Sequence, residues 1–207
     1  MPTSRSYQEA CGIARALDVV GERWALLVVR ELLFGPQRFS VLRKALPAAS
    51  TNLLTDRLRE LEGNGVLHRR RVDGAWVYEL TEWGRRLEPI LLALGGWGLR
   101  VPLPPGPALN ATSVMIFLRG VVRPGPEASY RIELDGRVWT VRTGGGEVSV
   151  AAGEPAEADA SIRTDPATLN ELLSDAATLD TAVSDGRVVV TGSLPAFRRL
   201  VRSAVTP

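Results

Sequence analysis

The 207-residue sequence has very little cysteine and histidine, with one residue of each kind, Cys11 and His68. A single cysteine excludes a disulfide within the chain, and a metal site would have to be built mostly from carboxylates. No apolar run reaches the roughly 18 residues that a membrane-spanning helix needs. The start of the sequence also lacks the apolar core of a signal peptide. We therefore expect a cytoplasmic protein with no membrane span and no metal site.

Lysine is almost absent as well, since Lys44 is the one lysine among 25 basic residues. The charge is unevenly divided along the chain. Residues 1–100 hold 15 Arg or Lys against 11 Asp or Glu, whereas residues 101–207 hold 10 against 12. The first half is therefore net positive and the second net negative, which favours a polyanionic partner for the first half alone. A hydrophobic content of 45% with 23% charged residues is typical of a globular protein.

A proline-rich stretch, VPLPPGPAL at 101–109, divides the sequence. Prolines at this density do not continue a helix and favour an extended, semi-rigid spacer. Apolar residues recur mostly at helical spacing before this stretch and mostly alternate with polar residues after it. We therefore predict two domains, 1–100 and 110–207, joined by a linker over 101–109. The fold class is predicted to be α+β, with a mainly antiparallel sheet in the second domain.

The first domain has the pattern of a winged helix-turn-helix. Its helical patterns cover residues 7–20, 22–35, 38–46, 51–62 and 82–98. Strands over 66–72 and 75–80 precede the last helix and meet at Asp73-Gly74, a pair typical of a tight hairpin. Thr81 is expected to cap the last helix. This order places a two-stranded hairpin, the wing, directly after the second helix of the helix-turn-helix motif.

The helix predicted over 51–62 has two chemically different faces. Leu54, Leu58 and Leu61 form an apolar stripe, and short polar side chains lie opposite. A helix that enters the major groove of DNA needs both faces, one to anchor it and one to contact base edges. Strand alternation in the hairpin sends Arg70 to the side opposite Arg69 and Arg71. The candidate DNA-binding residues are Ser50, Thr51, Asn52, Thr55, Arg57, Arg59, Arg69, Arg70 and Arg71.

Residues 11–97, from CGIARALDVVG through STNLLTDRLRELEGNGVLHRRR to LLALGGW, closely resemble HxlR-type bacterial transcriptional regulators. The resemblance implies a recognition helix at 50–62, a wing at 66–80, and a homodimer formed by the first and last helices of the domain. Such a dimer would bind an inverted repeat in double-stranded DNA. The family often has Cys-Pro where this chain has Cys11-Gly12. Because some members sense oxidants or electrophiles through a cysteine near this position, Cys11 is either a redox site or a small buried residue at the dimer interface.

The second half alternates apolar and polar residues in several segments. Six strands are predicted, over 113–122, 129–136, 137–145, 147–153, 160–165 and 186–192, with helices over 166–175, 177–185 and 193–205. Residues 112–205 more weakly resemble the sterol-carrier-protein lipid-binding domain, most clearly in DGRVVVTG followed by an apolar helix. The resemblance implies a sheet covered by helices, with an apolar cavity between them.

Eight apolar residues of this domain are candidates for binding an apolar small molecule or a lipid. They are Met115, Phe117, Trp139, Leu169, Leu172, Leu173, Phe197 and Leu200. The same residues also suit a different role, because a domain of about 95 residues needs most of its apolar side chains to fill its core. Both roles stay open at this point.

No pattern in the sequence indicates catalysis. It has no glycine-rich phosphate loop, no nucleophile elbow, and no partner that would make His68 a catalytic base. We therefore expect no enzymatic activity and no cofactor. The sequence predicts a dimeric, ligand-responsive transcriptional regulator. Two alternatives are a redox-sensing repressor switched through Cys11, and a lipid carrier whose helical domain serves only to dimerise it.

Overall fold

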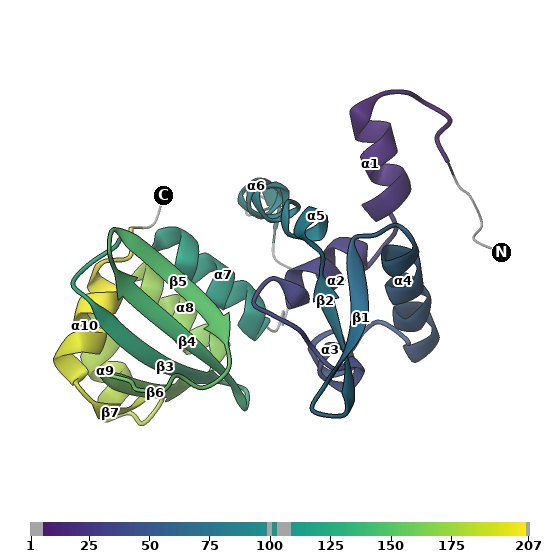
Figure 1. Cartoon of the computed structure of the whole chain (residues 1–207). Helices are drawn as coiled ribbons and strands as arrows, with labels where there is room; N and C mark the ends of the chain where they lie inside the picture. The colour runs from purple at the N-terminus through teal and green to yellow at the C-terminus, as the bar shows by residue number, and fades with distance from the viewer. Residues whose placement is uncertain (1–5, 99–100, 103–108, 206–207) are drawn as a thin grey trace. The chain divides into compact units, whose positions relative to one another are not determined.

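The computed structural model describes residues 6–98, 101–102 and 109–205. The chain forms two compact units, Met1–Leu103 and Pro104–Pro207 (Figure 1). Most of the predicted linker, residues 103–108, lies outside the described residues. Within the described part of the chain, no helix is long and apolar enough to cross a membrane.

The first unit contains the predicted helices and hairpin in the predicted order. Its elements are α1 (Gly12–Val20), α2 (Ala25–Leu32), α3 (Phe39–Ala45), α4 (Thr51–Gly63), β1 (Leu67–Val72), β2 (Ala75–Leu80), α5 (Glu82–Arg85) and α6 (Glu88–Gly98). The first helix begins at Gly12 rather than at residue 7. Gln8 has a left-handed φ of 53°, and the carboxylate of Asp18 accepts a hydrogen bond from the amide of Tyr7 at 2.8 Å. Both features keep the preceding residues out of the helix.

The single helix predicted over 82–98 is two helices in the structure, α5 and α6. The division follows from Pro89, which has no amide hydrogen and whose ring conflicts with the carbonyl group four residues earlier, at Arg85. Accordingly, α5 ends at Arg85 and α6 begins at Glu88. The predicted cap is confirmed, because the hydroxyl of Thr81 accepts a hydrogen bond from the amide of Gly84 at 3.0 Å.

The core of the first unit is built around α4. Leu54, Leu58 and Leu61, the apolar stripe predicted from the sequence, are 0–1% exposed and pack with apolar residues of α2 and α3. Because the stripe is buried, the opposite face of α4 is turned to solvent. Ser50 fixes the start of this helix, since its hydroxyl accepts a hydrogen bond from the amide of Leu53 at 3.3 Å.

Thr81 and Gly84 join the hairpin to the helices that follow it. The carbonyl of Val66, one residue before β1, accepts a hydrogen bond from the amide of Thr81 at 3.0 Å. The hydroxyl of Thr81 donates to the carbonyl of Gly65 at 2.8 Å and lies 3.1 Å from the Val66 oxygen. Gly84 packs so closely on this carbonyl that a Cβ atom there would lie 2.0 Å from the Val66 oxygen. These contacts hold the start of the hairpin against α5.

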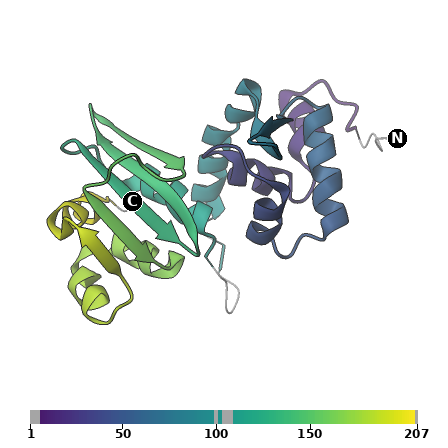
Figure 2. The same cartoon turned by 60° about the horizontal axis from the view of Figure 1, so that its bottom comes forward.

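The second unit is a sheet whose helices lie on one side of it (Figures 1 and 2). The strand order is β5-β4-β3-β6-β7, and every neighbouring pair is antiparallel except β3 with β6. This confirms the predicted α+β class. The elements are α7 (Ala111–Val121), β3 (Ala128–Leu134), β4 (Arg137–Gly144), β5 (Glu147–Ala152), β6 (Ala160–Thr164), α8 (Pro166–Ser174), the 3₁₀ turn η1 (Ala176–Thr178), α9 (Leu179–Ser184), β7 (Val189–Gly192) and α10 (Leu194–Arg202).

The strand predicted over 113–122 is wrong, because these residues belong to helix α7. The side chain of Asn110 caps this helix by accepting a hydrogen bond from the amide of Ser113 at 3.2 Å. Val114, Met115 and Leu118 are buried at helical spacing. The β-branched and aromatic residues of the segment favour a strand, but burial of this helical face outweighs that preference. The described sheet therefore has five strands rather than six.

We expect Gly84→Ala to lower the free energy of unfolding by about 1–3 kcal/mol, because the added methyl group has to displace the Val66 carbonyl or α5. Gly63→Ala is the control, since no atom lies within 4 Å of the position its Cβ would take. Urea unfolding of the full chain measures both variants. Equal stability of Gly84→Ala and the wild type would contradict the close packing at this glycine.

Candidate nucleic-acid interface

The exposed face of α4 brings together five of the predicted DNA-binding residues. Thr55 is half-buried and the other four are exposed; the five are Ser50, Thr51, Asn52, Thr55 and Arg59. Positions 52, 55 and 59 follow helical spacing and share one side of α4. The guanidinium of Arg59 has one long ion pair, 3.7 Å from the exposed carboxylate of Asp56. Its side chain is therefore able to move towards a base or a phosphate.

Arg57 is an exception, and its prediction as a DNA contact is wrong. Its side chain is 8% exposed and forms ion pairs with Glu60, on the same helix, and with Glu22 at 3.8 Å. The helical period places Arg57 beside the buried leucine stripe rather than on the polar face. The charge of Arg57 is therefore paired within the first unit, and its ion pair with Glu22 connects α4 to the segment before α2.

The arginines of β1 divide between the two sides of the hairpin. The guanidinium carbons of Arg69 and Arg71 lie 4.4 and 5.2 Å from the centre of the Trp76 ring. Arg70 is hydrogen-bonded and ion-paired to Glu79 instead. The predicted alternation of the three arginines is therefore confirmed.

Glu79 neutralises the side of the hairpin that carries Arg70. Its carboxylate is 17% exposed and also lies 3.0 Å from Arg85 and 3.7 Å from His68. The hydrogen bond from Arg70 lowers the pKa of Glu79, and the charges of Arg70, Arg85 and His68 lower it further. The guanidinium groups of Arg69 and Arg71 have no carboxylate partner among the described residues. These two arginines are thus available to DNA phosphates.

Trp76 is a candidate residue that the sequence prediction missed. It is 47% exposed near the end of the hairpin, in contact with the guanidinium groups of Arg69 and Arg71. An aromatic face attracts a cation by about 0.5–1 kcal/mol at an exposed site, so the ring restrains both arginines. The signal was present in the sequence. A two-residue turn at Asp73-Gly74 pairs Arg71 with Trp76.

Large apolar side chains are exposed on α1 and α6. Exposure is 72% for Ile13 and 43% for Leu17 on α1, and 54% for Ile90, 47% for Leu94 and 71% for Trp97 on α6. No residue of α6 is buried. Several large apolar side chains exposed on the same short helix are typical of a surface that another molecule covers.

Cys11 directly precedes α1 and is exposed in the single chain. The nearby backbone amides of Ala14 and Ile13 lower the pKa of its thiol. A thiol with a lowered pKa is more often a thiolate, the form that reacts with oxidants and electrophiles. The structure thus gives Cys11 the exposure that a redox role requires.

The predicted ligand-binding residues of the second unit lie in its core. Phe117 is half-buried, and the other seven are 0–2% exposed, namely Met115, Trp139, Leu169, Leu172, Leu173, Phe197 and Leu200. The indole nitrogen of Trp139 is buried and has no hydrogen-bond partner in the described part of the chain. The guanidinium carbon of Arg137 lies 4.8 Å from the centre of the Trp139 ring. These side chains fill the core, so an apolar ligand would have to move some of them.

Two family models match the chain, one in each unit. The HxlR-like helix-turn-helix model matches residues 19–102, and the SCP-2 sterol transfer family model matches residues 123–203.

In the described residues, no group of three or more His, Cys, Asp or Glu side chains is placed to hold a metal ion.

The relatives of the first unit are regulators of transcription rather than enzymes. The HTH-type transcriptional regulator YdeP of Bacillus subtilis (strain 168) is 40% identical over 93 residues, which are 44% of this chain and 73% of YdeP. The HTH-type regulator Mb3122 of Mycobacterium bovis is 38% identical over 106 residues, covering 49% of this chain and 66% of Mb3122. Among solved structures, the redox regulator HypR in its oxidized form is 35% identical and aligns over 45% of this chain and 100% of HypR, with a TM-score of 0.43.

We expect the double variant Arg69→Ala/Arg71→Ala to weaken binding to all DNA sequences alike. The slope of log affinity against log salt should fall by about 1 for each phosphate that each subunit no longer neutralises. Arg70→Ala is the matched control and should change the slope less, because Glu79 already pairs with that arginine. Fluorescence anisotropy at several salt concentrations measures all three proteins.

Two substitutions of Trp76 are measured in the same experiment. Trp76→Leu should reproduce part of the loss, roughly 2- to 5-fold in affinity, and Trp76→Phe should retain most of the wild-type affinity. Wild-type affinity and slope in the double arginine variant would refute the phosphate contacts. Wild-type behaviour of Trp76→Leu alone would refute the role of the ring in holding the arginines.

Proposed function

The chain belongs to the HxlR-like helix-turn-helix family, and on that premise we propose that it is a dimeric transcriptional regulator that binds an inverted-repeat operator in double-stranded DNA. The observation that carries the proposal is the pair of exposed surfaces on consecutive elements. One is the polar face of α4, and the other is the cluster of Arg69, Trp76 and Arg71 on the hairpin. A regulator of this kind acts in the cytoplasm.

The two surfaces have different roles in the proposed complex. Thr51, Asn52, Thr55 and Arg59 contact base edges in the major groove, because their side chains donate and accept hydrogen bonds there. Ser50 and the amides at the start of α4 contact a phosphate, as helix N-termini do. Arg69 and Arg71 bind the phosphate backbone beside the groove and set affinity rather than sequence preference.

The proposed dimer forms through α1 and α6. Their exposed side chains include Ile13, Leu94 and Trp97, which a second copy would remove from water. A two-fold dimer places two copies of α4 one DNA turn apart, about 34 Å, so the operator is an inverted repeat.

In the second unit we propose a site for an apolar small molecule or a lipid near Trp139 and Phe197. The match to the SCP-2 sterol transfer family and the unpaired indole nitrogen of Trp139 support this site. A ligand changes DNA affinity only if it binds the DNA-competent and DNA-incompetent forms of the dimer differently. A coupling free energy of about 1–3 kcal/mol, or 5- to 150-fold in operator affinity, is typical of such regulators.

A second candidate function is a redox-sensing repressor switched through Cys11. The exposure of Cys11 and the lowered pKa of its thiol favour it. Cys11→Ser separates the two functions, since it abolishes release of DNA by oxidants and leaves release by an apolar ligand intact. A lipid carrier that the helical unit merely dimerises would leave no footprint on DNA.

Selection of bound sequences from a random DNA pool is expected to return an inverted repeat. Asn52→Ala should cost about 1–3 kcal/mol of operator affinity and relax the preference at one position in each half-site, because a base loses its hydrogen-bonding partner. Asn64→Ala is the matched control, since Asn64 is the C-cap at the opposite end of α4. Selected sequences without two-fold symmetry, or an unchanged preference in Asn52→Ala, would contradict the proposal.

A further inference from the structure

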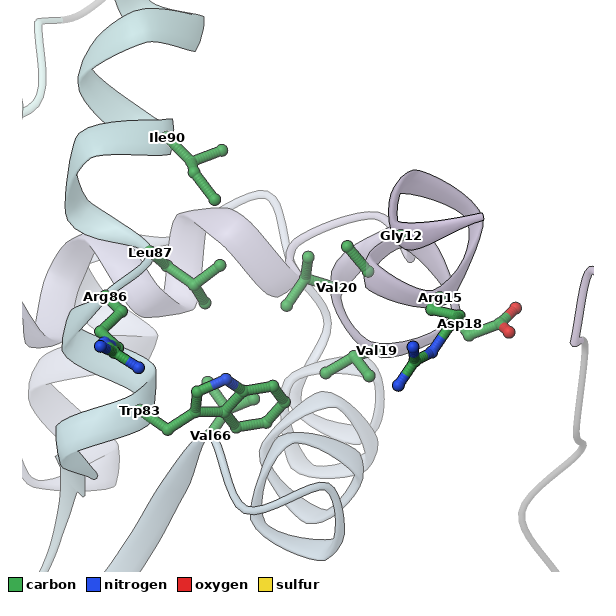
Figure 3. Close-up of a pocket in the computed structure, with 11 residues that line it drawn as sticks. Gly12, Arg15, Asp18, Val19, Val20, Val66, Trp83, Arg86, Leu87 and Ile90 are labelled. Atoms are coloured by element: carbon green, nitrogen blue, oxygen red, sulfur yellow. The ribbon is translucent and has the colours of Figure 1, made fainter. Parts of the chain in front are cut away.

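A cavity of about 570 Å³ lies in the first unit, between α1 and the helices α5 and α6. Figure 3 shows Val20 of α1 and Leu87 facing each other across it, with Ile90 and the ring of Trp83 at its two ends. The volume falls within the range of about 300–1,000 Å³ in which small-molecule sites are found. The facing side chains are apolar, which suits a ligand with an apolar body.

Two arginines lie at the rim of the cavity, whose lining also holds one carboxylate, Asp18. Arg15 comes from the α1 wall and Arg86 from the opposite wall (Figure 3). Neither guanidinium has a hydrogen-bond or ion-pair partner among the residues that the structure describes. Asp18 also lines the cavity, but its carboxylate already accepts hydrogen bonds from the hydroxyl of Ser6 at 3.0 Å and from the amide of Tyr7 at 2.8 Å. An anionic group at the rim would therefore meet unpaired arginine.

The floor of the cavity is connected to both DNA-facing elements. Val66 lines the cavity, is 1% exposed, and belongs to the core cluster that holds α4. Its carbonyl accepts the hydrogen bond from the amide of Thr81, and the next residue begins β1. A ligand that shifts Val66 relative to α1 would thus change the position of the hairpin relative to α4.

We propose that this cavity binds an aromatic carboxylate. The ring lies between Val20 and Leu87, beside Trp83, and the carboxylate is hydrogen-bonded to Arg15 or Arg86. This site is different from the apolar site proposed in the second unit. Binding of the carboxylate is independent of the proposed function, and its effect on DNA affinity rests on that function.

The test is calorimetric titration of the full chain with 2-naphthoate. The wild type is expected to bind it, and to bind the neutral analogue 2-naphthylmethanol about tenfold more weakly, as the loss of a charge-assisted hydrogen bond predicts. Arg15→Gln/Arg86→Gln should weaken binding of 2-naphthoate by at least about tenfold for the same reason. Arg163→Gln is the control, because Arg163 is an exposed arginine of β6 in the second unit.

A further variant locates the ligand. Ala16 lines the cavity and is exposed, so Ala16→Trp should fill the space and abolish binding while the chain still folds, as checked by circular dichroism. Absence of binding to the wild type overturns the proposal, and so does unchanged binding in the double arginine variant or in Ala16→Trp. If a second copy fills the cavity instead, 2-naphthoate does not bind and Ala16→Trp disrupts the dimer in sedimentation, which also overturns it.

Operator binding without ligand is measured on the same variants. A wild type that binds 2-naphthoate but no DNA would count against the proposed function and support the site. If 2-naphthoate binds as expected and changes operator affinity, the cavity is a regulatory site.

Discussion

The carbonyl group of Val66 is the point at which the parts of the first unit meet. It accepts a hydrogen bond from the amide of Thr81, shares the hydroxyl proton of Thr81 with the carbonyl of Gly65, and has Gly84 against it with no room for a side chain. The valine side chain packs into the core beneath α4, and the chain continues from it into the hairpin. The helix α4, the hairpin and α5 therefore take their relative positions from one short segment.

Electrostatic pairing then decides which charges face outward. Arg57 forms ion pairs with Glu22 and Glu60 inside the unit, and Arg70 forms an ion pair with Glu79. Arg69 and Arg71 have Trp76 as their neighbour, which restrains the two guanidinium groups without neutralising them. Such an arrangement favours phosphate binding, because the arginines lose less side-chain entropy when DNA arrives. The positive charge of the first half is thus concentrated on fewer side chains than its arginine content indicates.

Periodicity and turn chemistry were sufficient to predict most of the fold. The leucine stripe of α4, the Asp73-Gly74 hairpin and the cap at Thr81 depend on neighbours in sequence, and the structure contains all three. The helix α7 was mistaken for a strand because its β-branched and aromatic residues are buried on a helical face by elements distant in the sequence. Arg57 was placed with the DNA contacts because its ion pair with Glu22 joins two segments that sequence spacing does not bring together. The contact of Trp76 with the arginines could have been predicted from the sequence, because it depends only on the pairing register of the hairpin.

The central claim is that α4 and the hairpin bind DNA together, each through its own chemistry. The most direct measurement is a structure of the full chain bound to an operator obtained by selection. The account predicts α4 in the major groove with Asn52 at a base edge, and Arg69 and Arg71 at phosphates on the same half-site. A complex in which α4 faces away from the DNA, or in which the hairpin arginines contact only solvent, would contradict it.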